Sequence, residues 1–142
     1  MIRELVLHAN SKGVEIALLE DKKLVEYHLD AYDKEGFLAG DIYLGRVKKL
    51  NPGLNAAFID IGYDRDAFLH YTDLSPYIRS ILTFTHQAIQ GNTENDFSDF
   101  VLEPEIIKTG KISEVLNGKP NILVQISKEP IASKGPRLTC EI

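Results

Sequence analysis

A strict alternation of aliphatic side chains with others, in two short neighbouring stretches, is the feature that most constrains how this chain can fold. In GLNAAFIDIG, a β-strand would place Ile59 and Ile61 on one face, because successive side chains of a strand point to opposite sides. In DAFLHY, the same rule groups Leu69 with Tyr71. The two stretches are separated only by the turn at residues 62–65, so we expect them to be neighbours in one sheet.

The opposite face of these two strands carries aromatic side chains. Phe58 and Phe68 lie there with His70, so the sequence predicts an exposed apolar pair beside a histidine. Such a pair can stack unpaired bases, at about 1 to 3 kcal/mol per base. It can equally cover a second small core formed with residues 75–119, and the alternation alone does not decide between these two interpretations.

The rest of the chain also has the patterns of an all-β protein. Residues 2–29 alternate apolar runs with turn formers at 10–13 and 21–23, which predicts a three-stranded meander. Residues 30–40 lose this periodicity and indicate a connector. We expect five further strands in a second unit, at residues 41–50, 56–61, 66–70, 121–127 and 137–142.

The long connection at residues 75–119 needs structure of its own, because most connections are only about 4 to 6 residues long. Its apolar spacing predicts a helix over residues 76–90, starting at Ser75. The polar stretch QGNTENDFSD, residues 90–99, indicates a flexible tip.

Charge and composition restrict the possible partners. The net charge of −5 argues against broad binding of nucleic acid by counterion release, so any RNA site must be local. Basic residues gather in two places, where they either contact phosphates or only solvate strand faces: Arg46, Lys48 and Lys49, and Lys128, Lys134 and Arg137.

The single cysteine, Cys140, is expected to be a buried strand residue and not part of a disulfide. No apolar run is long enough to span a membrane and no secretory signal begins the chain, which predicts a cytoplasmic protein.

Three ordered segments carry a family resemblance. GDIYLGRVKKLNPGLNAAFIDIGYDRDAFLHYTDL resembles the opening strands of the S1 domain in the ribonuclease E/G family, and VQISKEPIASKGPRLTCEI resembles the end of that domain. Residues 1–30 resemble the first strands of the family's ribonuclease-H-like subdomain. The resemblance implies a five-stranded barrel of the OB type at residues 37–128 with its insertion at 75–119. It assigns residues 1–36 to the incomplete second subdomain and residues 129–142 to a strand that returns to it.

Carried over to matching positions, the resemblance marks Phe58, Phe68 and Lys134 as contacts to single-stranded RNA, and Lys128 as a weaker one. His70 is added from its side of the strand. The sequence departs from the family pattern in a longer insertion and in Pro120, which affect the rim of the site. Because stacking faces and a few cations read base edges poorly, we expect weak binding with little sequence preference.

The family's reaction is a Mg²⁺-assisted hydrolysis of RNA, in ribosomal RNA processing and messenger RNA decay in bacteria, by an enzyme that is expected to be a homo-oligomer. The aspartates of that reaction have no match in this sequence, so we expect binding without cleavage, no catalytic residue and no cofactor here. Asp60, Asp64 and Asp66 fit a solvated turn better than a metal site. Two rival hypotheses remain, namely a free-standing RNA-binding module related to translation and a protein-interaction module.

Overall fold

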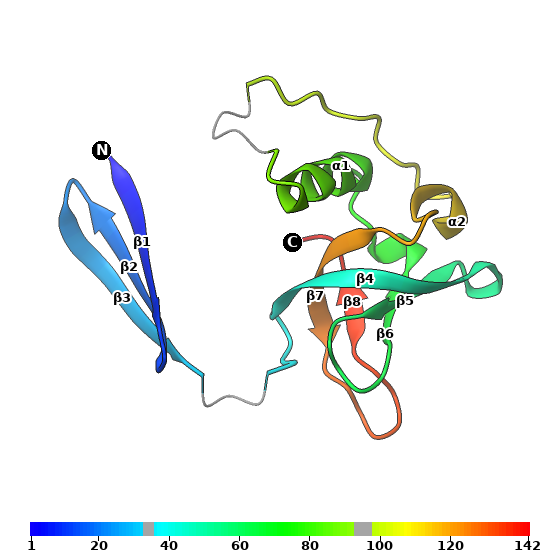
Figure 1. Ribbon diagram of the computed structural model, residues 1–142, viewed down its shortest axis with the longest axis horizontal. Helices are drawn as coiled ribbons and strands as arrows, with labels where there is room; N and C mark the ends of the chain where they lie inside the picture. Colours follow the sequence, from blue (N-terminus) through cyan, green and yellow to red (C-terminus); the bar gives the residue numbers. More distant parts are fainter. Residues whose placement is uncertain (33–35, 93–97) are drawn as a thin grey trace. The chain divides into compact units, whose positions relative to one another are not determined.

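The chain forms two compact units (Figure 1). The computed structural model describes residues 1–32, 36–92 and 98–142. The first unit is Met1–Gly36 and the second is Phe37–Ile142. Their boundary falls in the stretch that the sequence marks as a connector, of which residues 33–35 lie outside the described part.

The first unit is the expected meander. Strands β1 (Arg3–Asn10), β2 (Gly13–Glu20) and β3 (Lys23–Ala31) pair antiparallel in the order β1-β2-β3. Between β2 and β3, Asp21 and Lys22 have φ values of 47° and 65°, as the two central residues of a type I′ hairpin turn require. Large apolar side chains on the sheet are exposed, among them Leu5, Leu7 and Leu29. A three-stranded sheet of this size therefore leaves apolar surface uncovered.

The second unit is a closed five-stranded barrel, which confirms the OB-type fold class. Its strands are β4 (Ile42–Asn51), β5 (Ala56–Asp60), β6 (Ala67–His70), β7 (Asn121–Lys128) and β8 (Arg137–Thr139). They close in the order β4-β5-β6-β8-β7. Short 3₁₀ helices follow β4 and β6, at Pro52–Leu54 (η1) and Tyr71–Asp73 (η2).

The barrel core confirms the predicted strand faces. Ile59, Leu69 and Leu138 are fully buried there, together with Ile122 and Ile126 of β7. Phe58 and Phe68 are only half-buried and lie on the outer side. The alternation in the sequence therefore separates the core face from the outer face correctly.

Strand β8 corrects the expected division of the chain. The residue pattern placed a strand at 137–142 in the second unit, whereas the family resemblance assigned residues 129–142 to a strand that returns to the first subdomain. In the structure, β8 pairs parallel with β6 and antiparallel with β7 inside the barrel. The Phe68 amide donates to the Pro136 carbonyl at 2.8 Å, and the Cys140 amide donates to the Asp73 carbonyl at 2.8 Å. These hydrogen bonds and the burial of Leu138 make β8 the fifth barrel strand.

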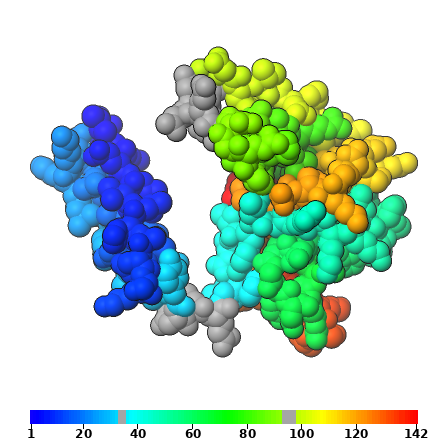
Figure 2. All heavy atoms as spheres, viewed as in Figure 1, coloured from blue at the N-terminus to red at the C-terminus, as the bar shows by residue number. Residues whose placement is uncertain are grey.

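The insertion packs against the barrel with its own helices, α1 (Ile78–Ile89) and α2 (Ile112–Val115). The expected helix is present, although it begins at Ile78 and the Ser75 hydroxyl accepts a hydrogen bond from the Tyr77 amide at 3.2 Å. The side chain of Asn55 holds the end of the insertion that leads back to the barrel. It donates to the Gly110 carbonyl at 3.1 Å and accepts from the Ile112 amide at 2.7 Å. Figure 2 shows α1 and residues 98–111 of the insertion at one end of this unit. Residues 93–97 of the predicted tip lie outside the described residues.

No helix in the described part of the chain combines the length and the apolar character needed to cross a membrane.

The single thiol is buried, and we expect it to react slowly in the folded protein. Cys140 follows β8 directly and is 2% exposed, so it is buried as predicted. Burial raises the pKa of its thiol to about 12, and the negative charge of Asp73 adds to this effect. We expect no alkylation of the folded protein at pH 8 and full alkylation in urea.

The raised pKa of Cys140 also predicts a dependence of stability on pH. Because an ordinary thiol ionises near 9.0, the free energy of unfolding should fall as the pH rises from there toward 12, and it should fall less in Cys140→Ala.

Candidate nucleic-acid interface

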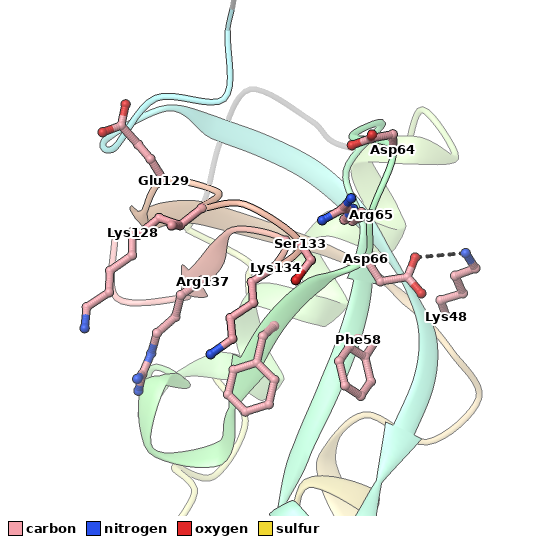
Figure 3. A pocket seen from close by; sticks show the side chains of 13 residues that line it. Lys48, Phe58, Asp64, Arg65, Asp66, Lys128, Glu129, Ser133, Lys134 and Arg137 are labelled. Carbon is pink, nitrogen blue, oxygen red and sulfur yellow. Dashed lines mark hydrogen bonds and ion pairs between the residues drawn. The ribbon is translucent and has the colours of Figure 1, made fainter.

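A groove of about 820 Å³ runs across the outer side of the barrel, where β5, β6, β7 and β8 meet the loops that join them. Its lining combines two aromatic rings with cationic side chains (Figure 3). The β5–β6 and β7–β8 loops project from the end of the barrel opposite α1 (Figure 1). Of the insertion residues that the structure describes, 75–92 and 98–119, none lines this groove.

The aromatic rings form the floor of the groove. Phe58 of β5 and Phe68 of β6 are direct cross-strand partners, and their ring centroids lie 5.9 Å apart at an interplanar angle of 68°. Both are half-buried. Of the two interpretations that the sequence left open, the structure contradicts a second core with the insertion, because the pair faces the groove instead.

Cationic side chains border the floor on one side. Lys128 of β7, Lys134 of the β7–β8 loop and Arg137 of β8 all line the groove. Figure 3 shows their charged ends directed to the same side of the groove. The three cations are thus gathered beside the rings, although the whole chain has a net charge of −5.

Two β-bulges increase the number of side chains that reach the outer face. The register between β4 and β5 shifts at Lys48, so that both Lys48 and Lys49 stand opposite Phe58. The register between β7 and β8 shifts in the same way at Ser127, next to Lys128. Since a bulge sets two residues against one, consecutive side chains can share one face, and Lys48 lines the groove in this way.

The β7–β8 loop is a tight hairpin that fixes Lys134. The main chains of Ile131 and Lys134 exchange two hydrogen bonds, at 3.2 and 2.9 Å. The guanidinium of Arg65 donates to the Ala132 carbonyl at 2.7 Å and so ties this hairpin to the β5–β6 turn. Lys134 is therefore held over the groove by the backbone around it, while its ammonium group remains exposed.

Gly135 allows this close approach of the two loops. A Cβ atom there would lie 2.1 Å from the carbonyl oxygen of Asp66, a distance that real side chains do not adopt. We predict that Gly135→Ala displaces the hairpin with Lys134, lowers the free energy of unfolding by about 1 to 3 kcal/mol and weakens nucleic-acid binding. Gly53→Ala is a matched control, since its Cβ would meet only the Asn51 side chain at 3.5 Å. Equal melting curves and equal affinities for both variants would contradict this role.

His70 lies beside the floor but does not line the groove. Its ring centroid is 6.5 Å from that of Phe68. Its Nδ1 atom accepts a hydrogen bond from the Thr72 amide at 3.1 Å, which caps the helix η2. The structure thus gives His70 a capping role, and only its Nε2 edge is left for a ligand.

Two acidic side chains at the β5–β6 turn, Asp60 and Asp66, are engaged by neighbouring groups, and a third, Asp64, lines the groove. Asp66 forms an ion pair with Lys48 at 2.8 Å, which raises the pKa of this lysine (Figure 3). Asp60 accepts from the Gly62 amide at 2.9 Å, as a turn-forming aspartate does. Among the described residues, no group of three or more histidine, cysteine or acidic side chains is placed to hold a metal ion.

Known proteins with similar sequences place the chain in a family. It is 31% identical to ribonuclease G of Salmonella typhimurium over 142 residues, which is all of this chain and 25% of that protein. It is 34% identical to ribonuclease G of Haemophilus influenzae over 139 residues, or 98% of this chain and 24% of that protein. The chain belongs to the ribonuclease E/G family. A ribonuclease E of Synechocystis is 38% identical over 104 residues, which cover 72% of this chain and 12% of that enzyme.

The chain spans about a quarter of the length of the ribonucleases G that it matches, and it corresponds to their N-terminal region. No model of a known protein family matches it.

In this member of the ribonuclease E/G family, the groove brings together four of the five residues singled out from the sequence: Phe58, Phe68, Lys128 and Lys134. The sequence missed the roles of Lys48, Arg65 and Arg137. Lys48 and Arg137 were visible only as members of basic clusters, and their places depend on the two bulges. Nothing in the sequence around Arg65 indicates that it holds a distant loop.

Proposed function

We propose that the barrel unit binds single-stranded RNA in this groove for an endoribonuclease of the ribonuclease E/G type. The observation that carries the proposal is the cross-strand pair Phe58 and Phe68, open to solvent on one side and bordered by Lys128, Lys134 and the Asp73-paired Arg137. Aromatic faces stack on bases that are not already paired, and nearby cations bind the phosphates between them.

The chemistry of the groove suits holding RNA better than cutting it. Stacking contributes about 1 to 3 kcal/mol per base and tolerates any base. Lys128 and Lys134 are exposed, so they can meet phosphates without a cost of burial. Among the acidic side chains at the β5–β6 turn, Asp66 is paired with Lys48 and Asp60 accepts from the Gly62 amide. The groove therefore supplies affinity, and we assign the cutting reaction to other parts of the whole enzyme.

The activity of the whole enzyme is part of the same proposal. The relatives carry the names ribonuclease G and ribonuclease E. We propose that the full-length protein is a Mg²⁺-dependent hydrolase of RNA and a homo-oligomer, and that it acts on ribosomal RNA precursors and messenger RNA in the bacterial cytoplasm. In that enzyme, the barrel would hold the substrate strand.

The test is the binding of a labelled decamer of mixed-sequence RNA, followed by fluorescence anisotropy at several salt concentrations. We expect the single strand to bind, the same sequence as a duplex to bind much more weakly, and the affinity for the single strand to fall with salt. Duplex and single strand bound equally well would exclude stacking as the source of affinity. No binding of the single strand at low salt would favour a protein-interaction module.

Lys134→Ala is expected to remove about one phosphate contact. The slope of log affinity against log salt should decrease by about 0.7, the value for one contact to a single strand. Lys108→Ala is the matched control, because Lys108 lies in the insertion and does not line the groove. A weaker affinity of Lys134→Ala with an unchanged slope would give Lys134 a structural role only.

A further inference from the structure

The register of the barrel places Arg137 in line with the two rings. Phe58 pairs with Phe68, Phe68 pairs with Arg137 of β8, and Arg137 pairs with Lys128 of β7. Paired residues of neighbouring strands point to the same side of a sheet, and the next residue on β8, Leu138, points into the core. The side chain of Arg137 therefore lies on the outer face, directly beside Phe68, and it lines the groove.

A carboxylate fixes the orientation of this arginine. The Nε and Nη2 groups of Arg137 both donate to one oxygen of Asp73, at 3.3 and 2.9 Å. Asp73 is itself held, because its carbonyl accepts from the Cys140 amide at 2.8 Å and from the Thr139 hydroxyl at 3.3 Å. The guanidinium is thus anchored by one edge, and its other edge, formed by Nη1 and Nη2, remains available to an acceptor in the groove.

The charge of this pair distinguishes Arg137 from the two lysines. Asp73 largely neutralises Arg137, whose side chain is 43% exposed, whereas Lys128 and Lys134 keep exposed ammonium groups. A neutral pair attracts a phosphate less than a lysine does, but it can still donate two parallel hydrogen bonds to an uncharged base. A guanidinium edge with two donors matches the two neighbouring acceptors of guanine, O6 and N7. Adenine offers one acceptor and one donor at the same positions.

We propose that Arg137, oriented by Asp73, reads the base that stacks on Phe68 and favours guanine there. This inference rests on the proposed function, because it requires that RNA occupies the groove. It assigns a preference at one nucleotide to a site whose stacking and phosphate contacts accept any sequence.

The experiment compares two labelled RNA decamers with the whole chain: ten adenosines, and alternating adenosine and guanosine. Both contain only purines and carry the same charge, so stacking and phosphate contacts are matched. We expect the guanosine-containing strand to bind about tenfold more tightly, near the lower end of what a bidentate arginine–guanine pair contributes. Arg137→Lys, which keeps the charge but loses the second donor edge, should reduce this preference to within about twofold.

Two further variants separate base reading from other roles. Asp73→Asn should lower the preference without lowering the affinity for oligoadenosine, since it releases the guanidinium but removes no positive charge. Lys128→Ala, the neighbour in the same row, should weaken both decamers equally. Thermal melting checks that each variant is folded. If Asp73→Asn unfolds, Arg137→Lys still decides the question.

Equal affinity of the unmodified chain for both decamers would overturn the inference and leave the proposed RNA binding intact. Equal weakening of both decamers in Arg137→Ala, with a salt slope smaller by about 0.7, would also overturn it and make Arg137 a phosphate contact. If neither decamer binds at low salt, the proposed function fails together with the inference.

Discussion

The double variant Phe58→Ala with Phe68→Ala is expected to abolish detectable binding of single-stranded RNA. Each ring can contribute about 1 to 3 kcal/mol of stacking, so the loss of both lowers the affinity by at least about thirtyfold. The rings are cross-strand partners and form the floor of the groove, and the remaining cations offer only screened phosphate contacts. Fluorescence anisotropy with the decamer of mixed sequence measures this loss.

The same variant also tests the assignment of strand faces. Phe58 and Phe68 are half-buried on the outer side of the barrel, so far-ultraviolet circular dichroism should be unchanged. Tyr77→Ala is a matched control, because Tyr77 is an exposed aromatic residue of the insertion that does not line the groove. It should leave binding unchanged. Unfolding of the double variant would show that the rings belong to the core, and undiminished binding would remove the basis of the proposed function.

Removal of β8 is expected to prevent folding of the barrel. Residues 37–128 contain the four longer strands, but without β8 the facing edges of β6 and β7 have no partner. The core also loses Leu138 and Cys140, which are almost completely buried. We therefore expect a chain of residues 37–142 to unfold cooperatively on heating, and a chain of residues 37–128 to show no cooperative transition.

Leu138→Ala is the corresponding single substitution. Truncation of a fully buried leucine typically lowers the free energy of unfolding by about 2 to 5 kcal/mol, which urea denaturation measures. Ile131→Ala, at a side chain that is 72% exposed in the adjacent loop, should have little effect. A cooperative transition in residues 37–128, at the temperature found for residues 37–142, would show that the barrel closes without β8.

The sequence alone determined the features that depend on local patterns. Period-two alternation separated Ile59 and Leu69 from Phe58 and Phe68, because the side chains of any strand alternate whatever it pairs with. Short turns identified the meander in residues 2–29, since neighbouring strands joined by a tight turn pair with each other. The motifs of residues 40–74 and 124–142 indicated the family.

The tertiary structure alone decided which strands meet and at which register. Three residues of β8 give no local sign of their partner, and their place between β6 and β7 depends on hydrogen bonds to residues far away in sequence. The bulges at Lys48 and Ser127 come from the same non-local pairing, and they determine which cations share a face with the rings. Arg137 meets Phe68 and Asp73 for this reason. Such contacts form only when the barrel closes, so no local alternation in the sequence encodes them.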